Sequence, residues 1–444
     1  MSDVEKKSNE SGALKQFGLA SQTRSRSTRG EVADDRSQDV LYWMFVALLI
    51  GITFFQKIGL VTGDGAIFPL IVPLSFIVIG VGLVYARPLI RVGRIVACAV
   101  AMTAILLSTG LFARTYSQGS VLLLVALYLP FVFAFRTEQK TYLKCLRFFS
   151  TLMLFFAGVV WAQHAIQFTV GWRWWPNLDL LLPKSLLIPQ FNYIQPIRYG
   201  LDYMKPSGIF FLEVSTLSQF IALAVIIEIV FFQRWARVAF LGATLFATFA
   251  GTGTLLVVVA MPLLFVRMST RTFIGALAAI LATLFIAVQL HWFELTMNRV
   301  DEFGRTGTSA NSRFIDPIYR LAKPLVSDAG LYSGIGAGQI ESGGNTFWWP
   351  ITKLSVEYGL IEAVIFYAFV IFCLLEGGMS RRFAFVLIIW YSFEGTLLTA
   401  YNPLTCVLLV TMFHVTSRKS ASRSADRGRR SDADRTLGSG LAST

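Results

Sequence analysis

Ionisable residues that can bind anions and transfer protons gather between residues 292 and 346. A guanidinium group binds anionic oxygens through paired hydrogen bonds, and a carboxylate can accept a proton. The same groups can instead form ion pairs with one another inside a loop. Because the chain is 55% hydrophobic and only 15% charged, we expect any chemistry to lie in this stretch. Its ionisable residues include Arg299, Arg305, Arg313, Arg320, Lys323, Glu294, Asp301, Glu302, Asp316, Asp328 and Glu341.

Long apolar runs must position this stretch. The chain has a mean hydropathy of +0.61, and many of its runs are long enough to cross a hydrocarbon core of about 30 Å. The runs are continuously apolar, whereas the strands of a membrane barrel alternate. We therefore expect an all-α, polytopic transmembrane bundle of about 12 spans. The runs cover residues 40–57, 66–86, 95–113, 119–135, 146–168, 208–232, 238–266, 272–291, 347–376, 383–400 and 402–416.

Basic residues predict the orientation of the bundle. They cluster in alternate short connections, for example Arg87, Arg91 and Arg94, and such loops usually remain cytoplasmic. We expect a multi-pass protein of a bacterial inner membrane with both termini cytoplasmic. The two long loops, 169–207 and 292–346, are then periplasmic parts of the membrane domain, 40–416.

The net charge of +13 lies largely in two Ser-rich tails, residues 1–39 and 417–444, which we expect to be disordered and cytoplasmic. We interpret the tails as topology signals beside anionic membrane lipid, and we expect no nucleic-acid partner.

Residues 238–266 predict a hairpin. As one straight helix they would span about 43 Å, longer than the hydrocarbon core. Both flanks are basic, so both ends are expected on the cytoplasmic side. The Gly-Thr-Gly-Thr sequence at 251–254 permits a turn, and its hydroxyl groups can satisfy free backbone groups. We expect the chain to fold back there, with the tip inside the membrane and facing a cavity.

The first long loop contains several Trp and Pro residues, including Trp172, Trp174 and Trp175. Aromatic residues of this kind usually mark the membrane interface, and an interfacial helix is one interpretation. A platform for sugar substrates is the other, since sugars stack on indole rings. On that second interpretation Arg173 and Arg198 are predicted to bind substrate.

No metal or cofactor site is expected from the sequence. The four cysteines, Cys98, Cys145, Cys373 and Cys406, show neither a pairing pattern nor metal-ligand spacing. Acidic residues within apolar runs are functional candidates by default, because they are costly in a membrane. Glu213, near the outer end of its run, is one of them.

Several short motifs between residues 238 and 366 resemble the O-antigen ligase and polymerase superfamily. The family pattern is an arginine at the start of a periplasmic helix, a glycine-rich turn, an asparagine late in the loop, and a Glu-x-Gly-Leu-Ile start to the next membrane helix. The matching segments are Asn311-Ser312-Arg313-Phe314, Pro317-Ile318-Tyr319, Leu331 to Gly338, Asn345-Thr346-Phe347, Glu357 to Ile361, and the tip at 251–256.

This resemblance implies glycosyl transfer at the periplasmic face from a sugar chain on undecaprenyl diphosphate. A guanidinium group suits the charge that develops on the diphosphate leaving group. Arg313 matches the functional arginine of the family, and Asn345 matches its late-loop asparagine. The general base would be Glu341, with Asp316 or His291 as alternatives. Substrate contacts are expected from Arg299, Arg305, Arg320 and Glu357.

Two departures from the family pattern bear on the function. Gly344 precedes Asn345 where ligases have a histidine, and the hairpin tip lacks an arginine. The first leaves the general base to another residue, and the second favours a polymerase of lipid-linked repeats for exopolysaccharide or O-antigen. A ligase that transfers polymer to lipid A-core is one alternative, and a lipid-linked oligosaccharide flippase is another. The expected partners are the lipid-linked oligosaccharide, membrane lipid, a flippase and a chain-length regulator.

Overall fold

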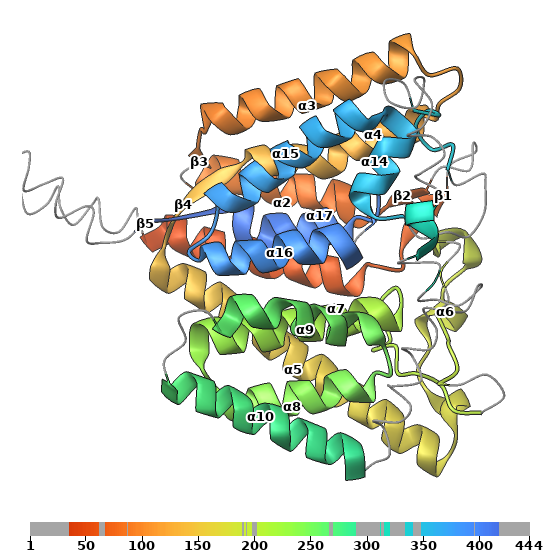
Figure 1. Ribbon diagram of the computed structural model, residues 1–444, viewed down its shortest axis with the longest axis vertical. Coiled ribbons are helices and arrows are strands. Elements are labelled where there is room, and N and C mark those ends of the chain that lie inside the picture. The colour runs from red at the N-terminus through yellow and green to blue at the C-terminus, as the bar shows by residue number, and fades with distance from the viewer. Residues whose placement is uncertain are drawn as a thin grey trace, which may run out of the picture.

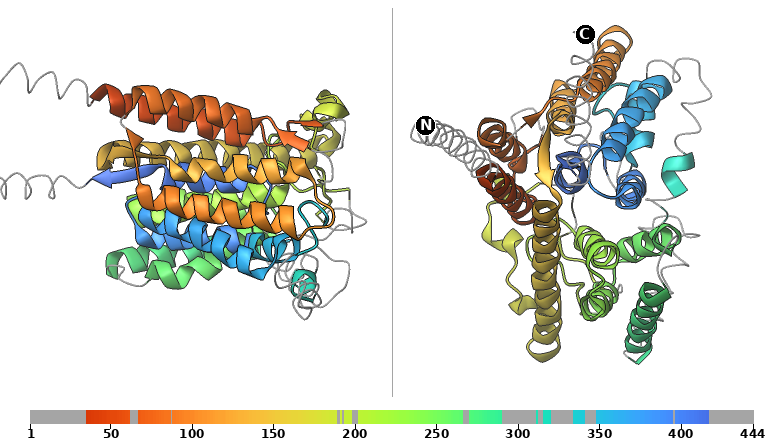
Figure 2. Two further views of the ribbon diagram at one scale, coloured as in Figure 1. Left: turned by 90° about the horizontal axis from the view of Figure 1, so that it is seen from above. Right: turned by 90° about the vertical axis from the view of Figure 1, so that its left-hand side faces the viewer.

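The protein is mostly helical, and its helices run side by side in a bundle (Figures 1 and 2). The computed structural model describes residues 35–61, 67–86, 88–188, 191, 193–197, 202–265, 270–289, 311, 315–319, 334–340, 348–394 and 396–416. Among these residues, four helices are long and apolar enough to cross a membrane: Asp35–Phe54, Val92–Leu111, Gln139–Thr169 and Val214–Phe232. Both predicted tails lie largely outside the described residues, although residues 35–39 belong to the first of these helices.

The first half of the chain alternates long helices with short strands. Its elements are the helix Asp35–Phe54, β1 (Gly59–Val61), β2 (Ile67–Pro69), α2 (Ile71–Tyr85), β3 (Pro88–Leu89), α3 (Val92–Leu111), α4 (Gln118–Tyr128), η1 (Leu129–Val132), β4 (Ala134–Glu138) and α5 (Gln139–Thr169). The loop after α5 holds η2 (Trp172–Trp174), α6 (Leu178–Leu181) and η3 (Lys184–Leu186).

The second half is almost wholly helical. Its elements are α7 (Val214–Ile227), η4 (Glu228–Phe232), α8 (Trp235–Ala247), α9 (Gly251–Phe265), α10 (Thr270–Gln289), α14 (Pro350–Tyr358), α15 (Leu360–Glu376), α16 (Arg381–Glu394), α17 (Tyr401–Cys406), η8 (Val407–Thr411) and β5 (Phe413–Thr416). Several predicted runs, two of them in this half, are not single helices. Run 347–376 breaks at Gly359, whose φ is +105°, and run 402–416 ends in β5.

The two ends of the bundle differ (Figure 1). The β1–β2 hairpin, α6 and the segment 334–340 lie at one end, here called the loop end. The opposite end, here called the sheet end, carries a three-stranded sheet in the order β3-β4-β5. In that sheet β3 pairs antiparallel with β4, whereas β4 and β5 run parallel.

The fold-back between α8 and α9 confirms a break in run 238–266. The break occupies residues 248–250, where Phe249 takes a left-handed φ of +53°, and Gly251 begins α9. Helix α9 then packs against α7 at very short range. A Cβ atom on Gly253 would lie 2.3 Å from the Ser218 carbonyl oxygen, so a residue without a side chain is needed there.

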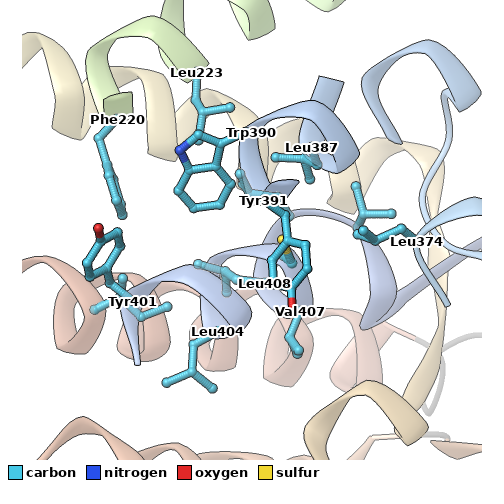
Figure 3. Close-up of a cluster of buried hydrophobic side chains, with 14 of the residues drawn as sticks. Phe220, Leu223, Leu374, Leu387, Trp390, Tyr391, Tyr401, Leu404, Val407 and Leu408 are labelled. Atoms are coloured by element: carbon cyan, nitrogen blue, oxygen red, sulfur yellow. The ribbon is translucent and has the colours of Figure 1, made fainter. Parts of the chain in front are cut away.

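Aromatic side chains fill the centre of the bundle (Figure 3). Trp390 and Tyr391 of α16 lie between α7 and the α17–η8 helix, among Phe220, Leu404 and other apolar side chains. Their polar atoms are paired: the Trp390 indole N–H donates to Gln219 at 3.1 Å, and the Tyr391 and Tyr128 hydroxyl groups lie 2.6 Å apart. These bonds remove the cost of burying polar atoms in an apolar core.

Candidate functional site

Most site residues predicted from the sequence lie outside the described residues. Of the predicted catalytic and substrate-binding residues, the structure describes Arg173 and Glu357. The others lie outside the described residues, as does His291: Arg313, Glu341, Asn345, Arg299, Arg305, Arg320 and Arg198. Asp316, the second alternative base, lies in a short helical segment at 316–319.

Arg173 lies on the surface of the first long loop. It is exposed on η2, and its guanidinium carbon is 6.0 Å from the centre of the Trp172 ring. The neighbouring Trp175 is buried, and its indole N–H donates to the Gln163 carbonyl oxygen of α5 at 2.7 Å. One tryptophan thus anchors the loop to the bundle, while Arg173 faces outward.

Glu357 lies at the end of α14 and holds the glycine-rich turn. Its side chain is 1% exposed, and Oε1 accepts the Gly338 N–H at 3.0 Å. The same oxygen lies 3.8 Å from Lys353 Nζ, one helical turn earlier. Glu357 therefore fixes the turn within the fold, and its predicted contact with substrate stays a prediction.

The turn at 334–340 can be formed only with glycine at three positions. Gly334, Gly336 and Gly338 all have positive φ, at +57°, +102° and +72°. A Cβ atom on Gly336 would lie 2.0 Å from the Thr115 carbonyl oxygen, and the Ala337 carbonyl oxygen accepts the Ser117 N–H at 2.9 Å. The turn is therefore pressed against the α3–α4 connection, which gives the returning loop a rigid base.

A buried ion pair lies at the loop end. Lys57 Nζ is 3.2 Å from Asp179 Oδ1, and the two side chains are 1% and 10% exposed. The ammonium group also lies 4.9 Å from the centre of the Tyr193 ring, within cation–π range. The Tyr193 hydroxyl donates to the Ile188 carbonyl oxygen. These contacts join the end of the first helix to α6 and to the loop that follows.

Glu213 completes this group, which we call the Lys57 cluster: Lys57, Asp179, Tyr193 and Glu213. Burial raises the pKa of Tyr193 to about 12, and the carboxylates of Asp179 and Glu213 add to the rise. Burial lowers the pKa of Lys57, and Asp179 opposes part of that shift. The Tyr193 phenol therefore stays protonated at neutral pH and acts as a hydrogen-bond donor, while the two carboxylates act as acceptors.

Three glutamine side chains clamp the segment that leads into α7. Each uses its carbonyl oxygen to accept a backbone N–H, and the three N–H groups are spaced four residues apart. The segment is buried without being helical, so its backbone needs such partners. The pairs are Gln167 with Met204 at 3.0 Å, Gln163 with Gly208 at 3.0 Å, and Gln56 with Leu212 at 3.1 Å.

The tip of the α8–α9 hairpin packs against the first turn of α7, next to Glu213. Thr252 Oγ1 lies 3.2 Å from Ser218 Oγ, and the Gly253 N–H donates to the same Ser218 hydroxyl at 3.2 Å. Hydroxyl groups thus satisfy N–H groups at the break, but they belong to Ser218 and to Thr248, which accepts the Ala250 N–H at 3.3 Å, and not to the Gly-Thr-Gly-Thr sequence as predicted. The tip packs against α7 through Gly253, whereas Gly251 is exposed and a Cβ atom there would meet nothing within 4 Å, so the expected cavity stays a prediction.

Both ring nitrogens of His164, which lies near the same tip, form hydrogen bonds. Because a carbonyl oxygen can only accept, Nε2 donates to Ala247 at 2.7 Å. Nδ1 then accepts from the Gln167 amide at 3.0 Å. Neither nitrogen is left for proton transfer, so we assign His164 a structural role.

The chain matches no protein-family model, no curated protein and no solved structure.

The Lys57 cluster was not predicted from the sequence. Lys57 and Asp179 are 122 residues apart, and neither belongs to a recognisable motif. One signal was present: Lys57 is an isolated basic residue at the end of an apolar run, next to a connection that carries few charges. Among the described residues, no three His, Cys, Asp or Glu side chains lie close enough together to hold a metal ion.

Proposed function

We propose that the protein is a glycosyltransferase that polymerises oligosaccharide repeat units carried on undecaprenyl diphosphate. In this proposal the bundle crosses a bacterial inner membrane about twelve times, with both termini in the cytoplasm. The loop end is then periplasmic, and the repeats are joined there without a metal ion to form an exopolysaccharide or O-antigen. The alternation of helices between the loop end and the sheet end supports this topology (Figure 1).

The observation that carries the proposal is the gathering of polar and aromatic groups at the loop end. The buried Lys57 cluster fixes α6 and the loop that follows it to the end of the first helix, so the exposed residues of that loop are held in place. Trp174 nearby in the sequence is 74% exposed, and an open indole face can stack against a sugar ring. The glycine-rich turn, one of the motifs of the resemblance, is anchored at the same end through Glu357.

The proposed reaction follows from the chemistry of the donor. A hydroxyl oxygen of the acceptor attacks the anomeric carbon of the donor sugar, and its proton passes to a general base, for which Glu341 is the first candidate. The bond between the anomeric carbon and the phosphate oxygen breaks, and its electron pair leaves on undecaprenyl diphosphate. The Arg313 guanidinium group would stabilise that developing negative charge through two parallel hydrogen bonds.

The packed interior favours an enzyme over a flippase. A flippase needs a polar route through the bundle, with charged residues lining its centre. In the part of the chain that the structure describes, Trp390, Tyr391 and Phe220 fill the space between α7, α16 and α17 (Figure 3). A ligase would use the same donor and remains the alternative within the enzyme class.

The test is polymerisation by the purified full-length protein in proteoliposomes, with lipid-linked repeats as the sole sugar substrate. A ladder of polymers is expected from a polymerase. Growth only after addition of lipid A-core identifies a ligase, and transfer of repeats across the bilayer without bond formation identifies a flippase. Either of the last two results overturns the proposal.

Arg313→Ala should reduce the polymerisation rate by about 30- to 1,000-fold, the equivalent of 2 to 4 kcal/mol of lost transition-state stabilisation. Arg313→Lys should be nearly as slow, because lysine keeps the charge but cannot form the paired contact. Arg381→Ala is the matched control, since Arg381 is an exposed arginine at the start of α16, at the sheet end. Full activity of Arg313→Ala would exclude this arginine from the mechanism.

A further inference from the structure

A second cluster of charged residues lies at the sheet end, remote from the loops. Arg136 on β4 pairs in register with His414 on β5. Residues paired in this way project their side chains from the same face of a sheet. Arg91, just before α3, reaches the same place, with its Nη2 atom 2.8 Å and 2.9 Å from the two His414 ring nitrogens.

In the described part of this region, one carboxylate is paired with the arginines. Glu376, at the end of α15, lies 2.6 Å from Arg91 Nη1 and 2.6 Å from Arg94 Nε. Arg94 is buried and also donates to the Thr411 carbonyl oxygen at 2.7 Å. Since Glu376 is shared by two arginines and Arg136 adds a third guanidinium group, positive charge remains in excess here.

Arg136 is available to a ligand. Its side chain is exposed, and it has no ion-pair partner within the described residues. Glu138, two residues further along β4, is paired in register with Thr416 and forms no ion pair with Arg136 in that same part of the chain. Burial lowers the pKa of His414, and Arg91, Arg94 and Arg136 lower it further, while Glu376 opposes the shift.

The surroundings indicate which kind of anion would bind. Ile90 and Val92, on either side of Arg91, are 78% and 68% exposed, and Phe372 on α15 is 41% exposed. A phosphate group is tetrahedral, and two of its oxygens can accept paired hydrogen bonds from one guanidinium group. In a phospholipid the phosphate group is linked through glycerol to acyl chains. Those chains would cover the exposed apolar side chains beside Arg91.

We propose that Arg91, Arg136 and His414 form a binding site for a phosphate-bearing anion at the sheet end. The exposed apolar residues beside Arg91 favour an anionic phospholipid over a soluble phosphate as its source. This site is separate from the proposed glycosyl transfer and does not depend on it.

The test compares lipid retention by the full-length protein in two kinds of nanodisc. One contains phosphatidylcholine alone, and the other contains equal amounts of phosphatidylcholine and phosphatidylglycerol. Native mass spectrometry then counts the lipid molecules that stay bound after release. For the unaltered protein we expect phosphatidylglycerol to be retained in preference to phosphatidylcholine.

Arg136→Gln should reduce this preference by about tenfold, as expected when one charge-assisted contact is lost. The change removes no ion pair among the residues that the structure describes, so the variant should fold normally. Arg381→Gln is the control, because it removes an exposed arginine from the same end of the bundle. An equal loss in both variants would show nonspecific attraction to basic side chains and would overturn the site, as would an unchanged Arg136→Gln.

A soluble source is tested by adding inorganic phosphate to the protein in phosphatidylcholine nanodiscs. If phosphate raises the melting temperature of the unaltered protein but not of Arg136→Gln, and phosphatidylglycerol is not preferred, the same site takes a soluble anion. The site would stand in that case, and its assignment to lipid would be wrong.

Discussion

At the scale of single residues, the buried pair of Lys57 and Asp179 makes a prediction about stability. Removing one partner leaves the other charge buried without compensation, which costs about 3 kcal/mol or more. Asp179→Asn should therefore lower the melting temperature of the detergent-solubilised protein markedly, measured by intrinsic tryptophan fluorescence.

The double variant Lys57→Met with Asp179→Leu is the control for that experiment. It removes both charges. Its loss of stability should therefore be smaller than the sum of the losses measured for Lys57→Met and Asp179→Leu separately. Strictly additive losses would show that the two side chains do not interact.

Gly336 offers a second test at this scale. A Cβ atom there would approach the Thr115 carbonyl oxygen to 2.0 Å, and the residue has a φ of +102°. Gly336→Ala should thus displace the glycine-rich turn and destabilise the protein by about 2 kcal/mol or more. Limited proteolysis of the folded protein should show faster cleavage near the turn.

Gly110→Ala is the matched control, because Gly110 lies within α3 and a Cβ atom there would meet nothing within 4 Å. Alanine is favoured over glycine in a helix by up to about 1 kcal/mol, so this variant should be neutral or slightly more stable. Equal sensitivity of the two variants to protease would mean that the turn is not held as the structure describes.

At the scale of elements, the fold-back between α8 and α9 makes a topological prediction. Reporter fusions within 233–234 and within 266–269 should report the same side of the membrane, because α8 and α9 leave and return to the same end of the bundle. A cysteine in place of Gly251, which is exposed and where a Cβ atom would meet nothing within 4 Å, should react with a membrane-impermeant reagent only from the opposite side. Opposite reporter signals at the two fusion sites would contradict the hairpin.

Some helix and strand boundaries could be predicted from the sequence, and others could not. The break in run 238–266 was predicted because a straight helix would be too long and a Gly-Thr sequence offered a turn. Strands β4 and β5 were missed because each lies at the end of an apolar run, where hydropathy alone cannot distinguish strand from helix. The sequence predicted a single helix start at Glu357 to Ile361, whereas the positive φ of Gly359 separates α14 from α15.

The candidate site was less predictable for a physical reason. The Lys57 cluster depends on contacts between residues 122 positions apart, which no local pattern encodes. Glu357 was identified as part of a motif, but its buried role as an acceptor for Gly338 follows only from the three-dimensional arrangement. Most of the predicted arginines lie outside the described residues, so their roles rest on sequence reasoning alone.

At the scale of the whole molecule, the proposed chemistry assigns the phosphate charge to arginine. Polymerisation by the purified protein should therefore continue in excess EDTA, and added magnesium or manganese should leave the rate unchanged. The measurement is polymer formation from lipid-linked repeats after extensive dialysis. A loss of activity that magnesium or manganese restores would show that carboxylates hold a catalytic metal ion.

The parallel pairing of β4 with β5 has a consequence for biosynthesis. Strand β5 comes at residues 413–416, yet its partner lies at 134–138, so the sheet cannot close until nearly the whole chain has been made. Arg94 likewise cannot donate to the Thr411 carbonyl oxygen until residue 411 has been made. Contacts between such distant positions form late, because a long loop must be closed first. Until then β4 has an open edge that other chains can pair with, and nascent protein should be most vulnerable to quality-control proteases at this step.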